Sequence, residues 1–417
     1  MRKFLINISY TVLPVWLFFV GMAVYLWAID DNSGDLMRLG LIDSGPEYTD
    51  SICSHLLPEV YYTGQDDDSL LRLDTCGVLV IGDSFSHGGG VGKQGDYVNY
   101  LAHESGRKVV VYTPQDPSLS SPMQIAFDLL NLGRIDSTNV KNLVVEEVER
   151  YLVDRHCGFT TKHTSIPRVE KTEETPAVTP DKSPSPLLRV KDFLFYHLFG
   201  ANPILKAQLS RPVFGGVQPD VLYFYNEDVK MGFDVSPKSR QLIVDCYRQV
   251  IEAARQRGVN LVLLVACDKY DILQDYIVDN PYPAKTLNED LMQWMAPDLD
   301  RFVFSKQVLS PYIEQGVKDV YLFNDTHWSP ASSQLISAEI IKKLFFLMIR
   351  RPPRSTQSPL WWRWHWWHCS WGIGRKARPV PTSCSWLQRL LKTMAAMTTQ
   401  CSCVMWVAGR YLSVARA

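Results

Sequence analysis

The fold is decided by the stretch Val78-Leu79-Val80-Ile81-Gly82-Asp83-Ser84-Phe85-Ser86-His87. Its four apolar residues, 78–81, predict a strand that is buried on both faces of a parallel sheet. The strand runs directly into Gly82, Asp83 and Ser84, so we expect the Ser84 hydroxyl at a strand's carboxyl end. Ligands of open α/β sheets bind at that end, because the loops there are free to carry chemistry. Ser84 is therefore a candidate nucleophile.

A second motif, Asp325-Thr326-His327-Trp328, supplies the groups that would activate a serine. An imidazole can take the hydroxyl proton, and a carboxylate two residues away can orient the imidazole. The following Ser329-Pro330 predicts an N-cap and the first residue of a helix, which would fix the loop that carries His327. We predict a triad of Ser84, His327 and Asp325. The alternative is that Asp325 and His327 only cap the helix.

Together, the two motifs Gly82-Asp83-Ser84-Phe85-Ser86 and Asp325-Thr326-His327-Trp328-Ser329-Pro330 resemble the SGNH/GDSL hydrolase superfamily, in particular its branch related to alginate O-acetyltransferases. The resemblance covers about residues 70–344. It implies a doubly wound, mostly parallel, flavodoxin-like α/β sheet. It also implies an acyl-enzyme mechanism on Ser84, without a cofactor or a metal.

The resemblance also suggests further site residues. Gly82 and Asp83 would shape the oxyanion site beside Ser84. The superfamily uses a glycine after the second strand and an asparagine after the third, but this chain has no glycine between Tyr112 and Leu132. The expected replacements and substrate contacts are Ser120, Arg150, Lys269 and Tyr270. For Arg150, stabilisation of substrate charge and a structural ion pair with Glu149 both remain open.

Segments with the apolar pattern of a strand alternate along the chain with segments that have the pattern of a helix, both before and after an insertion. We predict helices over 97–104, 123–132 and 237–257, and strands over 108–112, 142–148, 260–266 and 320–323. Residues 155–235 interrupt this alternation and are predicted to be an insertion, with a polar, mobile loop over 163–186. Within it, 193–205 is apolar enough to pack and, with 221–225, is predicted to form a lid or a substrate-facing insertion.

Charge is distributed unevenly along the chain. Residues 345–417 contain 11 Lys and Arg and no Asp or Glu, which leaves 32 basic and 44 acidic residues in 1–344, a net charge of −12. An acidic body argues against a nucleic-acid partner, because phosphate binding needs a basic face. Nine cysteines are too few for a disulfide scaffold; Cys246 and Cys267 are expected in the core, and a Cys53–Cys76 bridge stays open.

The N-terminus predicts membrane attachment. Arg2 and Lys3 precede an uncharged stretch that lasts until Asp30 and is long enough to cross a bilayer. By the positive-inside rule, the body lies outside the cytoplasm. We therefore expect a single-pass protein of a bacterial inner membrane, with residues 1–29 as anchor, 30–75 as tether and entry segment, and 76–344 as a periplasmic domain. A cleaved signal peptide is the alternative.

The sequence changes character at about Phe345. Eight of the 12 tryptophans follow residue 360, and the segment 345–356 resembles the translation of sequencing-adapter DNA. We interpret residues 345–417 as an artefactual or frame-shifted tail, so that the natural C-terminus would be missing. A membrane-surface segment and a metal site at His365, His368 and Cys369 are the alternatives.

The resemblance implies a membrane-anchored serine O-acetyltransferase that acts on an exported polysaccharide. An acetyl supply outside the cytoplasm would require a membrane-bound acyltransferase partner. The alternatives are an SGNH-class carbohydrate or acetyl esterase, with water as the acceptor, and a non-catalytic polysaccharide-binding module.

Overall fold

The computed structural model describes residues 2–29, 35–36, 55–64, 77–112, 121–136, 140–163, 190, 194, 198, 204–216, 218–230 and 235–349. The tail from residue 350 onward lies outside the described residues. The same holds for Cys53, Cys76, Ser120 and the loop predicted over 163–186, apart from its first residue, His163.

A six-stranded sheet in the order β1-β3-β2-β4-β7-β8 forms the centre of the fold, and every pairing in it is parallel. Without the edge strand β1, the order along the chain is second-first-third-fourth-fifth, which is the flavodoxin-like arrangement. The expected doubly wound α/β sheet is thus confirmed. The strands are β1 Tyr62–Gly64, β2 Val78–Ile81, β3 Val109–Tyr112, β4 Asn142–Val148, β7 Asn260–Ala266 and β8 Phe302–Phe304.

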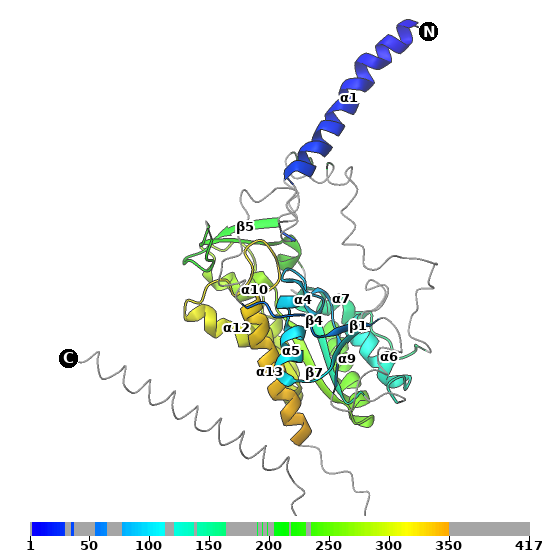
Figure 1. The fold of residues 1–417 in the computed structure, drawn as a ribbon, viewed down its shortest axis with the longest axis vertical. Coiled ribbons are helices and arrows are strands. Elements are labelled where there is room, and N and C mark those ends of the chain that lie inside the picture. Colours follow the sequence, from blue (N-terminus) through cyan, green and yellow to red (C-terminus); the bar gives the residue numbers. More distant parts are fainter. Residues whose placement is uncertain are drawn as a thin grey trace, which may run out of the picture. The chain divides into compact units, whose positions relative to one another are not determined.

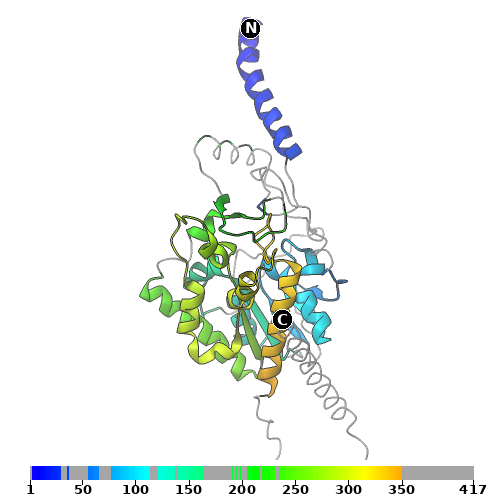
Figure 2. The same cartoon turned by 90° about the vertical axis from the view of Figure 1, so that its left-hand side faces the viewer.

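Helices cover both faces of this sheet. Helices α5 (Tyr97–Ser105) and α13 (Pro330–Ile349) lie side by side over one face (Figure 1, Figure 2). Helices α6 (Pro122–Asn131) and α9 (Pro237–Gln256) cover the other face. Strand β2 contributes Val78 and Val80 to the first core and Leu79 and Ile81 to the second, as its uninterrupted apolar sequence predicts.

Shorter helices connect these layers. The α-helices are α4 Gly92–Gly95, α7 Leu152–Cys157, α10 Lys269–Leu273, α11 Leu287–Trp294 and α12 Ser305–Glu314. The 3₁₀ helices are η2 Ser84–Ser86, η3 Glu149–Tyr151, η4 Asn226–Val229, η5 Gln274–Tyr276 and η6 Ala296–Arg301.

Most predicted helices and strands are confirmed to within a few residues, but the prediction of a last strand over 320–323 was wrong. Residues 320–323 form no strand and contribute only a bridge between Tyr321 and Trp328. Their backbone pairs locally: Leu322 N–H donates to the carbonyl of His327, and Ser329 N–H donates to that of Val320. The last strand of the sheet, both along the chain and at its edge, is instead β8. The local pairing folds the chain into a tight bend that carries Asp325 and His327.

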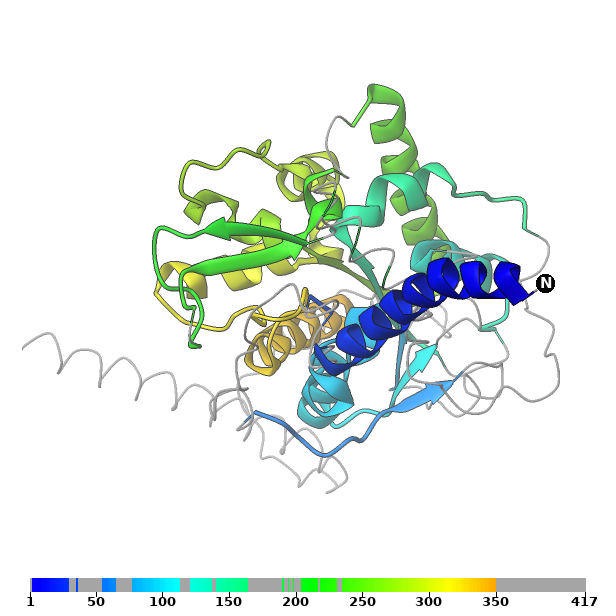
Figure 3. The same ribbon diagram turned by 90° about the horizontal axis from the view of Figure 1, so that it is seen from above.

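The insertion contributes a separate two-stranded antiparallel sheet. Strands β5 (Ile204–Gln208) and β6 (Val221–Tyr225) pair along their full length, and Figure 3 shows them side by side in green. Leu222, Tyr223 and Phe224 are buried in the core, as the apolar sequence of this segment predicts. This small sheet ends at Tyr225 and continues into η4, which carries Asp228.

Helix α1 (Arg2–Ile29) is long and apolar enough to cross a membrane. The segment Ile8–Tyr25 has a mean hydropathy of 1.7, and none of its residues is buried against the rest of the protein. At the other end, α13 continues through the change of composition at Phe345 to Ile349. Leu347 is buried in the same core as Leu344, so the domain extends a few residues past the expected boundary.

Candidate active site

Ser84 begins the 3₁₀ helix η2 immediately beyond β2, at the carboxyl edge of the sheet. Its side chain is exposed, whereas Phe85 and Ser86 are buried. The neighbouring strand β4 fixes this turn, because Glu146 Oε2 accepts hydrogen bonds from Asp83 N–H and Ser86 Oγ, each at 2.9 Å. As the first residue of a helix, Ser84 also presents an amide that has no intrahelical acceptor.

Gly82 is required here for space. A Cβ on Gly82 would overlap Ser86 Oγ and lie 2.5 Å from Glu146 Oε2. Asp83 is held by an ion pair with Arg155 at 3.1 Å and accepts from Phe85 N–H at 3.4 Å. Both predicted residues therefore shape the turn and border the cavity beside Ser84.

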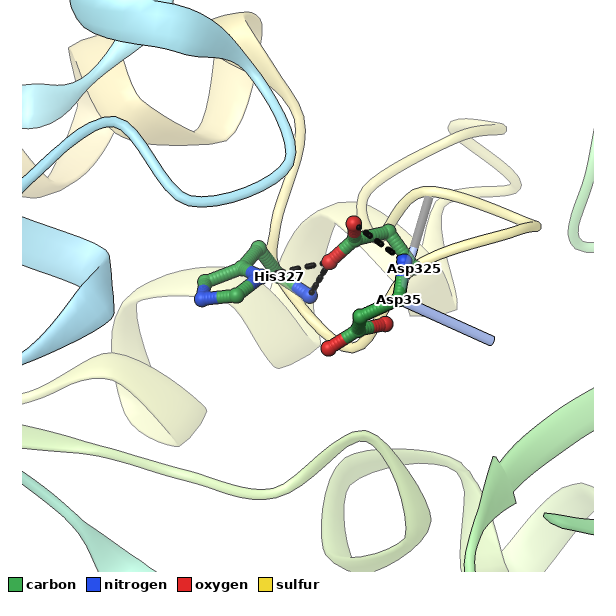
Figure 4. A group of neighbouring side chains, drawn as sticks. All are labelled: Asp35, Asp325 and His327. Atoms are coloured by element: carbon green, nitrogen blue, oxygen red, sulfur yellow. Dashed lines mark hydrogen bonds and ion pairs between the residues drawn. The ribbon is translucent and has the colours of Figure 1, made fainter. Parts of the chain in front are cut away.

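The structure joins Ser84, His327 and Asp325 in one hydrogen-bonded chain. Ser84 Oγ lies 2.8 Å from Nε2 of His327, although 243 positions separate the two residues. Nδ1 of the same ring lies 2.5 Å from Asp325 Oδ1, and the His327 amide donates to that oxygen at 3.0 Å (Figure 4). The ring also packs on Phe85, with centroids 4.4 Å apart. The predicted meeting of these residues across one sheet edge is confirmed.

Charge interactions favour an ionised Asp325 beside a basic His327. Burial raises the pKa of Asp325, but the charge and hydrogen bonds of His327 outweigh it, so the net pKa is lowered. Burial lowers the pKa of His327, but Asp325 outweighs it, so the net pKa is raised above 6.5. The imidazole is thus a stronger base than a free one, which suits proton transfer from a hydroxyl.

One residue at this site was missed from the sequence. Asp35, in the stretch read as a tether, donates its amide hydrogen to Asp325 Oδ2 at 3.0 Å. Its carboxylate accepts from Thr326 N–H at 2.9 Å and from Thr326 Oγ1 at 2.6 Å. Nothing in the sequence near Asp35 distinguishes it from neighbouring acidic residues, because the contact depends on the tertiary fold.

The same residues supply the donor types of a metal site. One ligand atom each from Asp35, Asp325 and His327 lies within 4.8 Å of the others (Figure 4). However, Asp325 Oδ1 and His327 Nδ1 are already bound to each other, and Nε2 faces Ser84. A cation would have to break this chain, so we assign no metal to it.

A cavity of about 410 Å³ opens beside Ser84. Several of its lining residues follow β2 and β4, which are adjacent in the sheet. The chain winds in opposite directions from these two strands, and ligands of doubly wound sheets bind at such switch points. Its lining consists of Asp35, Gly82, Asp83, Ser84, Phe85, His87, Pro122, Ile125, Val148, Arg150, Tyr151, Arg155, Tyr225, Thr326 and His327.

Arg150 borders this cavity, and of its two open alternatives the structure supports the structural ion pair, but with partners other than Glu149. Its guanidinium instead forms ion pairs with Asp228 at 3.1 Å and Asp268 at 2.9 Å. Glu149 accepts from the Asp268 amide at 3.1 Å. Because two carboxylates already neutralise Arg150, its role is to join the end of β4 to η4 and to the end of β7.

Lys269 and Tyr270 do not reach the cavity, which corrects the expectation of substrate contacts. Both side chains are fully buried, because α10 turns them into the interior. Lys269 Nζ donates to the carbonyl oxygens of Phe323 at 2.8 Å and Asp325 at 3.1 Å. The Tyr270 hydroxyl donates to the carbonyl of Pro283 at 2.8 Å. Lys269 therefore supports the loop that carries Asp325.

Tyr151, Arg155 and Tyr225 are among the lining residues that were not predicted as site residues. The Arg155 guanidinium lies 4.9 Å from the ring centre of Tyr151. Tyr151 and Arg155 follow β4 at the ligand-binding edge, so the predicted position of this strand could have identified both as site residues. Tyr225 comes from the insertion, in the segment 221–225 that was predicted to pack, but its place in the cavity was not predicted. His87 also lines the cavity, with Nε2 3.2 Å from the Gly82 carbonyl.

The fold and site define a class: an α/β protein with a serine, histidine and aspartate joined at the carboxyl edge of a parallel sheet. No family model matches the chain, and no curated protein matches it significantly.

Proposed function

We propose that this protein is a serine acyl-transfer enzyme of the SGNH type, with Ser84, His327 and Asp325 as its catalytic triad. The observation that carries the proposal is the hydrogen-bonded chain from Ser84 Oγ through His327 to Asp325, at the edge of a 410 Å³ cavity. The exposed hydroxyl and the buried carboxylate match the two roles, since the nucleophile must meet substrate while its partners stay oriented.

In the first half-reaction, Ser84 Oγ attacks an ester carbonyl while His327 Nε2 takes the hydroxyl proton. The tetrahedral intermediate then expels the alcohol, which receives that proton from His327, and an acyl-Ser84 remains. In the second half-reaction, His327 removes a proton from the acceptor hydroxyl. The acceptor oxygen attacks the acyl carbonyl, and Ser84 leaves as a hydroxyl by taking the proton back.

The negative oxygen of each intermediate needs donors. The Ser84 amide is one, because it has no helical acceptor and belongs to the nucleophile itself. A second donor from the loop containing Ser120 remains part of the proposal. Arg150 is unsuitable, because its charge is already shared by Asp228 and Asp268.

We further propose that the acceptor is a hydroxyl of an exported polysaccharide and that the acyl group is acetyl. The support is the resemblance of the two motifs to the alginate O-acetyltransferase-related branch, together with the apolar helix α1. Tyr151 and Tyr225 line the cavity, and aromatic side chains of this kind can contact a sugar ring. A bacterial inner-membrane location, a periplasmic domain and a membrane-bound acyltransferase partner belong to this proposal.

A second candidate is an acetyl esterase. Ser84 is exposed at the cavity, so water can reach an acyl group attached to it. The acyl-enzyme step is the same in both cases, and only the acceptor differs.

The test uses the full chain in detergent with 4-nitrophenyl acetate, with and without oligosaccharide acceptors. The wild type is compared with Ser84→Ala and with Ser310→Ala, a partly exposed serine on α12 away from the cavity. Ser84-dependent formation of acetylated sugar supports the transferase, and turnover independent of acceptor supports the esterase. Equal turnover by wild type and Ser84→Ala would leave only a polysaccharide-binding module.

A further inference from the structure

We propose that Asp35 is a positioning residue for the triad, so that the segment directly following α1 completes the active site. This inference rests on the proposed serine acyl-transfer function. Five residues, 30–34, separate the end of α1 at Ile29 from Asp35, and 290 positions separate Asp35 from Asp325.

The first contact fixes the rotation of the Asp325 carboxylate. One oxygen, Oδ1, accepts from both Nδ1 and the amide of His327. The other oxygen, Oδ2, accepts from the backbone amide of Asp35 at 3.0 Å. With both oxygens bound, the carboxylate has one favourable orientation, and it is the orientation that holds the imidazole toward Ser84.

The second contact fixes the loop between the two triad members. Thr326 lies between Asp325 and His327, and both its amide and its hydroxyl donate to the carboxylate of Asp35, at 2.9 and 2.6 Å. A carboxylate that accepts two such bonds stabilises one conformation of the loop more strongly than neutral acceptors would.

The segment containing Asp35 is itself anchored. The amide of Leu36 donates to the carbonyl of Asn324 at 3.1 Å, and its side chain is fully buried in the core. The hydroxyl of Tyr225, at the end of the insertion, donates to the Asp35 carbonyl at 3.3 Å. Residues 35–36 thus connect the catalytic loop to the insertion and to the core.

Asp35 also contributes charge. Burial, followed by the charge of Asp325, raises the pKa of Asp35, whereas His327 and the two Thr326 bonds lower it. An ionised Asp35 favours the imidazolium form of His327, as Asp325 and Asp83 also do. Lys269 approaches the loop from behind, at the Asp325 carbonyl. Replacing Asp35 by a neutral residue should therefore lower the pKa of His327 and make it a weaker base.

The test is the rate at which a fluorophosphonate probe labels Ser84 in the full chain in detergent, measured from pH 5 to 9. Asp35→Asn keeps the backbone amide but removes the charge and one of the two acceptor sites. We expect labelling to slow roughly 10- to 100-fold, the effect of losing a hydrogen bond to a charged group. The acidic limb of the pH profile should move to lower pH. Asp275→Asn, at an exposed residue of η5, is the control.

Labelling of Asp35→Asn within twofold of wild type, with an unmoved pH profile, would overturn the role of Asp35 while leaving the triad intact. Absence of Ser84-dependent labelling in the wild type would overturn both proposals. For Asp35→Asn, a slower rate with a shift to lower pH supports the proposal. If that variant lowers the melting temperature too far for labelling, Thr326→Val tests the contact alone, because it removes only the hydroxyl bond to Asp35 and leaves the charge in place. Slower labelling by Thr326→Val than by wild type supports the proposal, and an unchanged rate contradicts it.

Discussion

The amide of Asp83 donates a 2.9 Å hydrogen bond to Glu146, so the turn that presents Ser84 is tied to the adjacent strand β4. Glu146 is fully buried. Burial, followed by the charge of Asp83, raises the pKa of Glu146 well above 4.5. A carboxyl that stays protonated in the folded state costs stability as pH rises, because unfolding then releases a proton.

Glu146→Gln should therefore gain stability relative to wild type as pH rises. The wild type loses stability from about pH 4.5, where the unfolded carboxyl ionises, up to the raised folded pKa. The amide cannot ionise and lacks this loss. Melting temperatures of both proteins measured from pH 4 to 9 check the prediction, and parallel curves would contradict it.

Asp325→Asn should reduce ester turnover by roughly 10³- to 10⁴-fold, because the amide can hold the imidazole in the wrong tautomer. Asp325 also raises the pKa of His327, so its loss should move the acidic limb of kcat/KM to lower pH. The pH profile with 4-nitrophenyl acetate measures both effects. An unmoved limb, or turnover similar to that of Asp275→Asn, would sink the assigned role.

Gly89→Ala should disturb His327 directly. A Cβ on Gly89 would overlap the imidazole and lie 2.6 Å from its Cε1 atom, so the ring would have to leave Ser84. We expect a loss of about 10²-fold in turnover, as for a misplaced catalytic group. Gly158→Ala is the matched control, because its Cβ would lie 3.6 Å or more from its neighbours. Equal turnover by the two variants would refute the prediction.

The wild-type protein should become more stable as pH rises above about 7, and Lys269→Met should remove this rise. Burial lowers the pKa of Lys269 to about 7, whereas the unfolded side chain titrates near 10.5. Between these values the unfolded state binds more protons, so wild-type stability should rise from about pH 7 to 10.5 relative to the variant. Melting temperatures across this range test the sign. The variant should also be less stable by roughly 1–3 kcal/mol per carbonyl left unpaired.

Helix α1 should make the protein an integral membrane protein. Its apolar window, 8–25, is long enough to span the hydrocarbon core. After expression in a bacterium, the full chain should stay in the membrane fraction through alkaline carbonate washing, and protease added to spheroplasts should digest the domain. Release by carbonate would exclude the anchor, and protection from protease would reverse the proposed orientation.

Several features of the fold follow from local sequence. The apolar run 78–81, the capped helix that begins at Pro237 and the strand 260–266 were each predictable, because burial on both faces and helix capping leave strong periodic signals. The pairing of Ser84 with His327 was predictable from the two motifs that contain them, although only Ser84 follows a strand and His327 lies on a bend. The strand β8 was not, since three residues carry too short a pattern.

The sequence by itself determined the parallel character of the sheet and the three residues of the proposed triad, because the sheet leaves local apolar patterns and the three residues lie in two short motifs. Only the tertiary structure decided the partners of Arg150, the burial of Lys269 and the place of Asp35 beside Asp325. Those contacts join segments up to 290 positions apart. Their geometry depends on how the loops and the insertion pack, which leaves no periodic trace along the chain.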